Sequence, residues 1–208
     1  MFYMTPQEIV SKFGKFRGVL HVGAHEAQER NDYIAADFRK RCWVEANPQV
    51  CERLLRSIAG PDDLIYNAIV SETDGEETKF HVASNGQSSS ILPLKVHAEI
   101  YRDIVYTGYY SGKSTSLRTI LESIPESETY DFINLDIQGV ELRAIKGLGD
   151  RLSQFRAVYA EVNTLEMYEK CDMMADMDLF LESKGFTKIG YKLWGNDGWG
   201  DALYVRET

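Results

Sequence analysis

Short, β-branched apolar segments alternate with helical segments along the first 70 residues of this 208-residue chain. The apolar segments have the length and residue types of buried strands, and the segments between them carry apolar residues at helical spacing. This alternation with short loops predicts a parallel sheet that helices cover on both faces. The expected elements are strands at 18–23, 42–45 and 64–70 and helices over 27–39 and 48–58.

The same alternation returns after residue 130. The final two strands follow one another through the glycine-rich segment 195–200, which favours an antiparallel edge. We therefore expect an α/β fold with one doubly wound, mostly parallel seven-stranded sheet. The expected elements of this half are strands at 130–136, 157–162, 186–193 and 202–205 and helices over 140–147 and 174–184.

Residues 71–130 interrupt this order. The sequence Thr-Asp-Gly at 73–75 is typical of a hairpin turn, residues 80–82 alternate as a strand does, and 84–90 are polar. The segment is too short and too polar to have a core of its own. We expect an inserted hairpin and lid within a single domain spanning 1–208, with a helical lead-in over 1–16.

The charge and the cysteines restrict the partners and the compartment. The 32 acidic and 23 basic residues give a formal net charge of −9, whereas nucleic-acid backbones require a basic surface. Cys42, Cys51 and Cys171 form no C-x-x-C pair, so we expect reduced thiols and no zinc site. We find no signal peptide and no apolar run of the ~18–20 residues that span a membrane. A cytoplasmic protein without a nucleic-acid or membrane partner is expected, and the oligomeric state stays open.

A ligand of a parallel sheet lies beyond the carboxyl ends of the strands, near the point where the strand order reverses. A dinucleotide would require G-x-G-x-x-G after the first strand. Here Gly23 is followed by Ala24 and His25, so the second glycine is missing. Glu26 and Glu29 would also repel a pyrophosphate. The sequence therefore disfavours NAD and FAD.

Residues 108–114 come close to a phosphate-binding loop. The segment ends in Gly-Lys-Ser, as such a loop does, but it has one residue too few between its glycines. No clear strand precedes it. We interpret the segment as a chance match in a flexible loop.

Glu45 ends the second expected strand, 22 residues after Gly23. A carboxylate at about this offset accepts the hydroxyls of a ribose in nucleotide-binding folds. An acid favoured by the dipole of the following helix is the other interpretation. A nucleoside that lacks phosphate and carries positive charge fits the surrounding acids best, and S-adenosylmethionine has these properties.

One block of sequence is especially specific: residues 131–142 read Asp-Phe-Ile-Asn-Leu-Asp-Ile-Gln-Gly-Val-Glu-Leu. With other segments in the same order, it resembles the FkbM-type methyltransferases, which have the class I S-adenosylmethionine-dependent fold. The chain departs from the family at His21, where the first strand commonly carries Asp; Glu29 or Asp136 could replace that acid near the methionine end of the cofactor. The other matching segments are 19–25, 43–48, 67–71, 88–90, 146–147, 161–163 and 185–186.

The resemblance implies transfer of a methyl group from S-adenosylmethionine to a hydroxyl of a sugar, glycan or glycosylated metabolite. A hydroxyl needs a base that removes its proton as the new bond forms, and Asp136 and Glu141 are the candidates. The residues expected to bind the cofactor are Gly23, Ala24, His25, Glu29, Glu45, Ala46, Asn67, Ala68, Asp136 and Gln138. The residues expected to contact the acceptor are Ser89, Tyr109, Tyr110 and Glu161.

Several alternatives stay open. Glu141 also fits an ordinary first-turn acid that the helix dipole stabilises. Asp136, Glu161 and Asn163 end adjacent expected strands and offer oxygen ligands that suit Mg²⁺, so a divalent metal is a second, less favoured cofactor. The other function classes are a catalytically silent module that binds cofactor or a partner protein, and an NAD-type oxidoreductase, which is less favoured.

Overall fold

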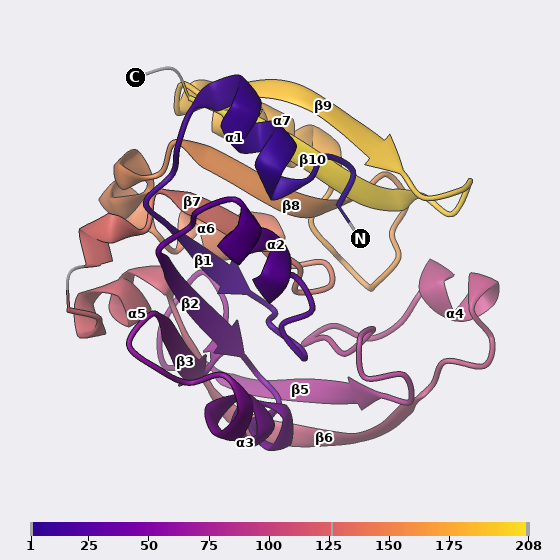
Figure 1. Ribbon diagram of the computed structural model, residues 1–208. Coiled ribbons are helices and arrows are strands. Elements are labelled where there is room, and N and C mark those ends of the chain that lie inside the picture. The colour runs from indigo at the N-terminus through magenta and orange to yellow at the C-terminus, as the bar shows by residue number, and fades with distance from the viewer. Residues whose placement is uncertain (1, 126, 207–208) are drawn as a thin grey trace.

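The computed structural model describes residues 2–125 and 127–206 (Figure 1). Residues 1, 126, 207 and 208, which fall within the single domain expected for 1–208, lie outside the described residues. Five strands of the central sheet are parallel, and β10 is antiparallel to both of its neighbours. This confirms the doubly wound, mostly parallel sheet. In spatial order its strands are β3 (Asp63–Asn67), β2 (Lys40–Glu45), β1 (Gly18–Val22), β7 (Phe132–Leu135), β8 (Ala157–Asn163), β10 (Trp199–Val205) and β9 (Thr187–Leu193).

Helices cover both faces of this sheet, and β1 shows why. Val19 packs on one face against residues of α1 and α2, whereas Leu20 and Val22 pack on the other face against α5 and α6. Figure 1 shows α1 and α2 in front of the sheet. No helix of the described residues is long and apolar enough to cross a membrane. The helices are α1 (Pro6–Phe13), α2 (Arg30–Ala35), α3 (Pro48–Ser57), α5 (Leu117–Ser123), α6 (Glu141–Lys146) and α7 (Met174–Ser183), with 3-10 turns at Ser127–Thr129 and Gly149–Gln154.

Local sequence signals set several helix ends. Thr5 and Glu8 form a reciprocal capping box at α1, within the expected lead-in, and the Asn47 side chain caps α3. The helix expected over 27–39 is shorter than predicted. Ala27 and Asp37 adopt left-handed backbone conformations, with φ of 53° and 62°, and a right-handed helix cannot continue through such residues.

A second, three-stranded sheet lies below the first in Figure 1. It has the order β4 (Ile69–Val70), β6 (Tyr106–Thr115), β5 (Glu77–Ala83). The strand predicted at 64–70 is thus two strands in different sheets, because the chain turns at Ala68, whose N–H donates to Glu45 O. The turn at 73–75 connects β4 to β5, which lie on opposite sides of β6. It therefore does not form the expected hairpin, in which the two connected strands would be neighbours. Residues 108–114 are extended within β6, so they are neither a flexible loop nor a phosphate cradle.

The expected lid is the connection between β5 and β6, which carries the short helix α4 (Val96–Ile100). It attaches to the loop after β8 through an isolated bridge between Leu94 and Tyr168. The segment from Ser116 onward differs from the prediction. Ser116 caps α5, and Leu117 and Leu121 of that helix are fully buried in the main core. No helix was expected there from the sequence, although α5 belongs to the layer that covers the sheet.

A buried ion cluster joins β2 and β3 at their amino ends. Asp63 is 3% exposed and lies opposite Arg41 in the strand register. Its carboxylate accepts hydrogen bonds from Arg41 Nε and Nη2 (2.7 and 2.8 Å), Arg30 Nη2 (2.9 Å) and Trp43 Nε1 (2.9 Å). Burial raises the pKa of Asp63, but these donors outweigh burial and lower the pKa to about 2.

Replacing Asp63 with asparagine is expected to lower the free energy of unfolding by about 3–5 kcal/mol, because Arg41 would stay buried without its anion. The stabilisation by the Asp63 carboxylate is present above its unfolded pKa of about 3.9. It is lost as the pH falls through its folded pKa of about 2. Urea denaturation measures both effects. The control Asp62→Asn removes an exposed pair with Lys40 and should cost less than about 1 kcal/mol; equal losses would contradict the prediction.

Candidate functional site

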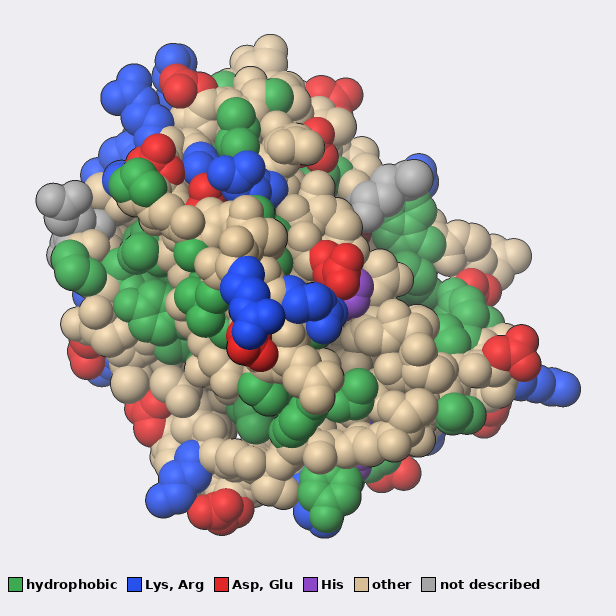
Figure 2. Space-filling model, turned by 60° about the horizontal axis from the view of Figure 1, so that its bottom comes forward, with side chains coloured by type: hydrophobic (Ala, Val, Ile, Leu, Met, Phe, Trp, Pro, Cys, Tyr) green, Lys and Arg blue, Asp and Glu red, His purple; other side chains and the backbone are tan. Residues whose placement is uncertain are grey.

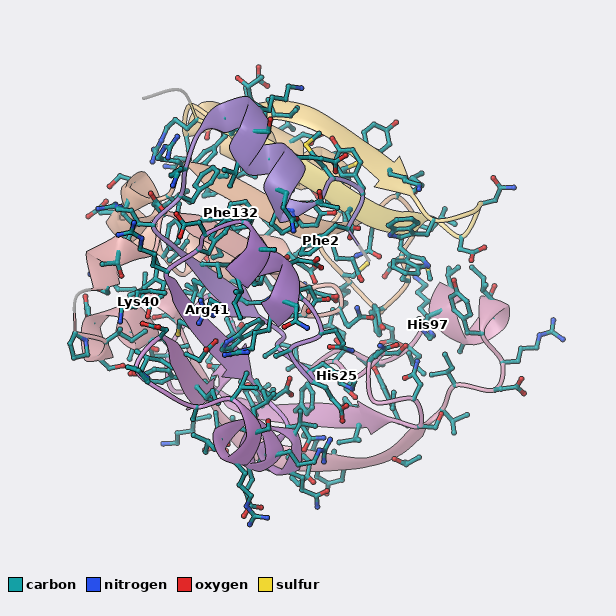
Figure 3. All side chains as sticks on the ribbon, viewed as in Figure 1. Phe2, His25, Lys40, Arg41, His97 and Phe132 are labelled. Atoms are coloured by element: carbon teal, nitrogen blue, oxygen red, sulfur yellow. The ribbon has the colours of Figure 1, made fainter. Side chains whose placement is uncertain are left out.

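Two adjacent cavities lie at the carboxyl ends of the parallel strands, where the order of the sheet reverses between β1 and β7. The narrow cavity, of about 60 Å³, lies between the ends of β1 and β2, strand β4 and residues 86–91. The wide cavity, of about 490 Å³, lies over the ends of β1, β7 and β8 and the start of β10, and α4 borders it. Figure 3 shows His25 and His97 on this side of the sheet, and Lys40 and Phe132 at the opposite, amino end. The residues that line both cavities are Gly23, His25, Gln87 and Asp136.

Gly23 allows the ends of β1 and β7 to meet. Its φ is +91°, and a Cβ built on it would lie 1.8 Å from the carbonyl oxygen of Asp136. The N–H groups of Gly23 and Ala24 both donate to Val44 O. Ala24 is buried and lines neither cavity. The structure therefore gives no support to its predicted contact with the cofactor. His25 follows with φ of 42° and borders both cavities.

The Glu45 carboxylate ties two loops together at the edge of the narrow cavity. Its oxygens accept hydrogen bonds from the N–H groups of His25 and Asn47, both at 2.7 Å. Burial raises the pKa of this carboxyl, and the same two donors oppose that shift. Each carboxylate oxygen can accept more than one hydrogen bond. Glu45 therefore combines a fixed position with capacity for ligand hydroxyls.

The neighbours of Glu45 divide into lining and supporting residues. Ala46 and Ala68 line the narrow cavity, as expected of cofactor contacts. Asn67 does not line either cavity. Its Nδ2 donates to the backbone oxygens of Glu45 (2.8 Å) and Ala46 (3.1 Å), so it supports the end of β2.

Gln138 connects the two acids over β7 and β8. Its Nε2 donates to Asp136 Oδ1 and to Glu161 Oε2, both at 2.8 Å, and its Oε1 accepts the hydroxyl of Tyr168. Gln138 has a backbone φ of 58°, which is uncommon for a residue other than glycine. Because protein groups engage both ends of its amide, Gln138 positions Asp136 and Glu161.

Glu141 occupies a different place from the one its predicted role requires. It is 1% exposed and lines neither cavity. Its oxygens accept the N–H groups of Ile137 (2.9 Å) and Gly139 (3.1 Å), which fixes the turn after β7. Burial raises the pKa of Glu141 to about 8, against the effect of these donors. The prediction of a general base at Glu141 is therefore corrected: the carboxyl is sealed beneath the turn.

His21, at the position where the family that the sequence resembles commonly carries Asp, lies in the wall of the wide cavity. Its Nδ1 is 3.0 Å from the hydroxyl of the buried Tyr33. Burial lowers the pKa of His21, and the charges of Glu29 and Asp136 oppose that shift. Both of these acids line the wide cavity. The two residues expected to replace the missing acid thus both lie close enough to His21 to affect its pKa.

The four residues predicted to contact the acceptor lie in different places. Glu161 lines the wide cavity, but Ser89 lines the narrow one, where its hydroxyl donates to Gly86 O. Tyr109 and Tyr110 line neither cavity, because both lie on β6; Tyr109 is 57% exposed and lies opposite His81 of β5. Their predicted contact with the acceptor is corrected. The aromatic side chains that do line the wide cavity are Tyr101, Tyr168, Trp194 and Trp199.

Sequence reasoning also missed an acid and a histidine in this cavity. Asp201, on β10, lies opposite Glu161 in the antiparallel register. His97 comes from α4, and its Nε2 is 3.1 Å from Ser88 Oγ. The pairing of β8 with β10 is the signal that would have found Asp201. Among the residues that the structure describes, no three His, Cys, Asp or Glu side chains form a group that could hold a metal ion.

The comparisons with solved structures agree with this fold. Sp1610 of Streptococcus pneumoniae, crystallised with S-adenosyl-L-methionine, is 10% identical with a TM-score of 0.54, covering 96% of this chain and 71% of that one. Magnesium protoporphyrin IX methyltransferase of Synechocystis PCC 6803, with bound SAH, is 9% identical with a TM-score of 0.53, covering 97% and 80%. A protein of the NADB-Rossmann superfamily from Streptococcus agalactiae is 10% identical with a TM-score of 0.53, covering 99% and 69%. At these identities the likeness shows the fold.

The family comparison covers the strands that build the site. No curated protein matches the chain. The sequence model of the methyltransferase FkbM domain matches residues 21–188, from β1 into β9, and this span includes Gly23, Glu45, Asp136 and Glu161. The chain therefore belongs to the family of methyltransferase FkbM domains.

Proposed function

We propose that this protein transfers a methyl group from S-adenosylmethionine to a hydroxyl of a sugar, glycan or glycosylated metabolite. The observation that carries the proposal is the position of Asp136. It is the one carboxylate of the described residues that lines both cavities, at the reversal of the strand order. A cofactor bound across the narrow cavity and an acceptor bound in the wide cavity would meet beside it.

The residues around the narrow cavity fit the cofactor. Gly23 lines the narrow cavity, and only a residue without a side chain allows the ends of β1 and β7 to approach so closely there. Glu45 presents a fixed carboxylate at the end of β2, where a ribose is held in related folds. Glu29 and Asp136 offer negative charge for the cationic end of the cofactor. The bound cofactors in the Streptococcus pneumoniae and Synechocystis structures support the same choice.

The side chains of this protein would bind the acceptor and remove the proton of its hydroxyl group. When bound, S-adenosylmethionine supplies a methyl group on a positively charged sulfur. Asp136 would accept the proton of the acceptor hydroxyl, since it faces the wide cavity. Gln138 would hold the Asp136 carboxylate in orientation through its hydrogen bond to Oδ1. Holding the reacting groups in line removes much of the entropic part of the barrier.

A small acceptor suits the wide cavity. A volume of about 490 Å³ lies within the range of small-molecule sites, and the rings of four aromatic residues offer flat faces to a sugar. On the outer surface, Figure 2 shows acidic and basic side chains interspersed over the face that it presents. This distribution differs from the continuous basic surface that nucleic acids require.

Titration calorimetry with S-adenosylhomocysteine tests the cofactor, and mass spectrometry of a hydroxylated acceptor pool tests the reaction. We expect binding of S-adenosylhomocysteine and products that are heavier by one methylene group. Absence of binding at millimolar concentration would overturn the proposal. Binding without turnover of any hydroxylated acceptor would instead favour a silent module, and binding of NAD in its place would favour an oxidoreductase.

Replacing Glu45 with glutamine is expected to weaken binding of S-adenosylhomocysteine by about tenfold or more, because charge-assisted hydrogen bonds to the ribose are lost. The control is Glu52→Gln, which makes the same change on the exposed face of α3. Calorimetry of both variants measures the difference. Equal affinities would show that Glu45 only joins its two loops.

A further inference from the structure

The part of the wide cavity over β8 and β10 contains a polar side chain without a partner. Asn163, at the end of β8, is wholly buried and lines this cavity. Neither Nδ2 nor Oδ1 of its amide has a hydrogen-bond partner within the described structure. Burying such a group costs free energy unless a partner is supplied. Asn163 is therefore arranged for a partner that a ligand would bring.

The same part of the cavity contains two neighbouring acidic side chains. Glu161 and Asp201 lie opposite one another on β8 and β10, and both line the cavity. Burial raises the pKa of Asp201 to about 7, with a contribution from the charge of Asp136. Burial and the neighbouring acids raise the pKa of Glu161 well above its usual value. Such repulsion between buried carboxylates is relieved by a cation or by hydrogen-bond donors.

The cofactor does not account for this pair. Adjacent strands are about 4.8 Å apart, so β8 and β10 lie about 10 and 14 Å from β1 across the sheet. Glu29 and Asp136 lie nearer, beside His21, and are available to the charged end of the cofactor. The pair of Glu161 and Asp201 is left for the acceptor.

Aromatic side chains line the same cavity as these acids. Tyr101 of the lid and Trp199 of β10 both line the cavity, and Trp199 Nε1 donates to the Tyr101 hydroxyl at 2.9 Å. The Tyr101 hydroxyl in turn donates to Asp197 (2.6 Å), which joins the lid to the turn between β9 and β10. Ring faces beside carboxylates attract organic cations.

We propose that Glu161, Asp201 and Asn163 form an acceptor subsite for a protonated amine and its neighbouring hydroxyl group, so that the preferred acceptor is an amino sugar. This inference rests on the proposed function and narrows its acceptor class. The two carboxylates accept hydrogen bonds from the ammonium group, and the Asn163 amide pairs with the hydroxyl. An anionic sugar is rejected, because it would meet the acids of the lining: Glu29, Asp136, Glu161 and Asp201.

Three sugars with the same ring test the charge preference: glucosamine, glucose and glucuronate. Each is titrated into the protein with bound S-adenosylhomocysteine at neutral pH, and fluorescence of Trp194 and Trp199 reports occupancy, since both line the cavity. We expect glucosamine to bind at least about tenfold more tightly than glucose, and glucuronate to bind most weakly. Asp201→Asn should remove the preference for glucosamine, because it keeps an acceptor for the Tyr159 hydroxyl but loses the charge.

A second variant gives an independent measurement. Asn163→Leu should weaken binding of glucosamine and glucose alike and raise the unfolding temperature of the free protein, because an unpartnered buried amide becomes an apolar group of similar size. A lower unfolding temperature with unchanged sugar binding would overturn the assignment of Asn163.

The proposal is overturned if glucosamine and glucose bind equally, if neither sugar binds, or if Mg²⁺ alone binds and Asp201→Asn abolishes that binding. A separate titration of the free protein with S-adenosylhomocysteine keeps the two proposals distinguishable. If the free protein does not bind S-adenosylhomocysteine, the proposed methyltransferase activity is refuted. Binding of S-adenosylhomocysteine without a preference for glucosamine refutes the subsite alone.

Discussion

Replacing Asp136 with asparagine is expected to lower kcat for methyl transfer by about 10²- to 10⁴-fold, the contribution of a positioned general base. Asparagine has nearly the shape of aspartate, and its Oδ1 would still accept the hydrogen bond from Gln138. The variant therefore removes the base and preserves the geometry. S-adenosylhomocysteine lacks the positive sulfur, so its affinity should fall much less than kcat.

The measurements are single-turnover rates on the acceptor and calorimetric affinities for S-adenosylhomocysteine. Asp150→Asn, on the exposed 3-10 turn Gly149–Gln154, makes the same substitution outside both cavities and should leave both quantities unchanged. A kcat above one tenth of the wild-type value, or a parallel loss of affinity and kcat, would show that Asp136 acts only in binding. In that event Glu161, the other acid held by Gln138, becomes the candidate base.

The lining of the narrow cavity was largely predictable from sequence, because it depends on short segments at strand ends. Gly23, Glu45 and Asp136 each end or follow a parallel strand, and parallel strands bring their carboxyl ends to one edge. Sequence alone could not show what their side chains contact. Ala24 and Asn67 have the expected positions in the chain, yet one packs inward and the other supports β2.

The lining of the wide cavity was less predictable, because contacts between distant segments create it. Asp201 enters the cavity only through the pairing of β10 with β8, and His97 only because α4, in the connection between β5 and β6, borders the cavity. Tyr109 was expected in a loop, because the residues around it are polar. In the structure these residues form strand β6. The role of Glu141 is decided by its direction: its carboxyl turns toward the backbone of Gly139 and away from the cavity.

Replacing Gly23 with alanine is expected to reduce methyl transfer by at least about 100-fold, because a displacement of about 1 Å at the reacting groups has such an effect. The added Cβ would lie 1.8 Å from Asp136 O, so the ends of β1 and β7 would have to separate. Gly75→Ala is the matched control. Its φ of +84° is close to the +91° of Gly23, but no atom lies within 4 Å of its Cβ position.

The comparison of these two variants isolates the clash from backbone strain. Gly75→Ala should lower the free energy of unfolding by about 1 kcal/mol, the cost of a left-handed alanine, and leave binding of S-adenosylhomocysteine intact. Gly23→Ala should add an overpacking cost of about 1–3 kcal/mol and abolish that binding. Urea denaturation and calorimetry give both quantities. If Gly23→Ala binds S-adenosylhomocysteine as the wild type does, the contact between the ends of β1 and β7 is not the cradle of the cofactor, and the ligand must lie farther along the narrow cavity toward Glu45.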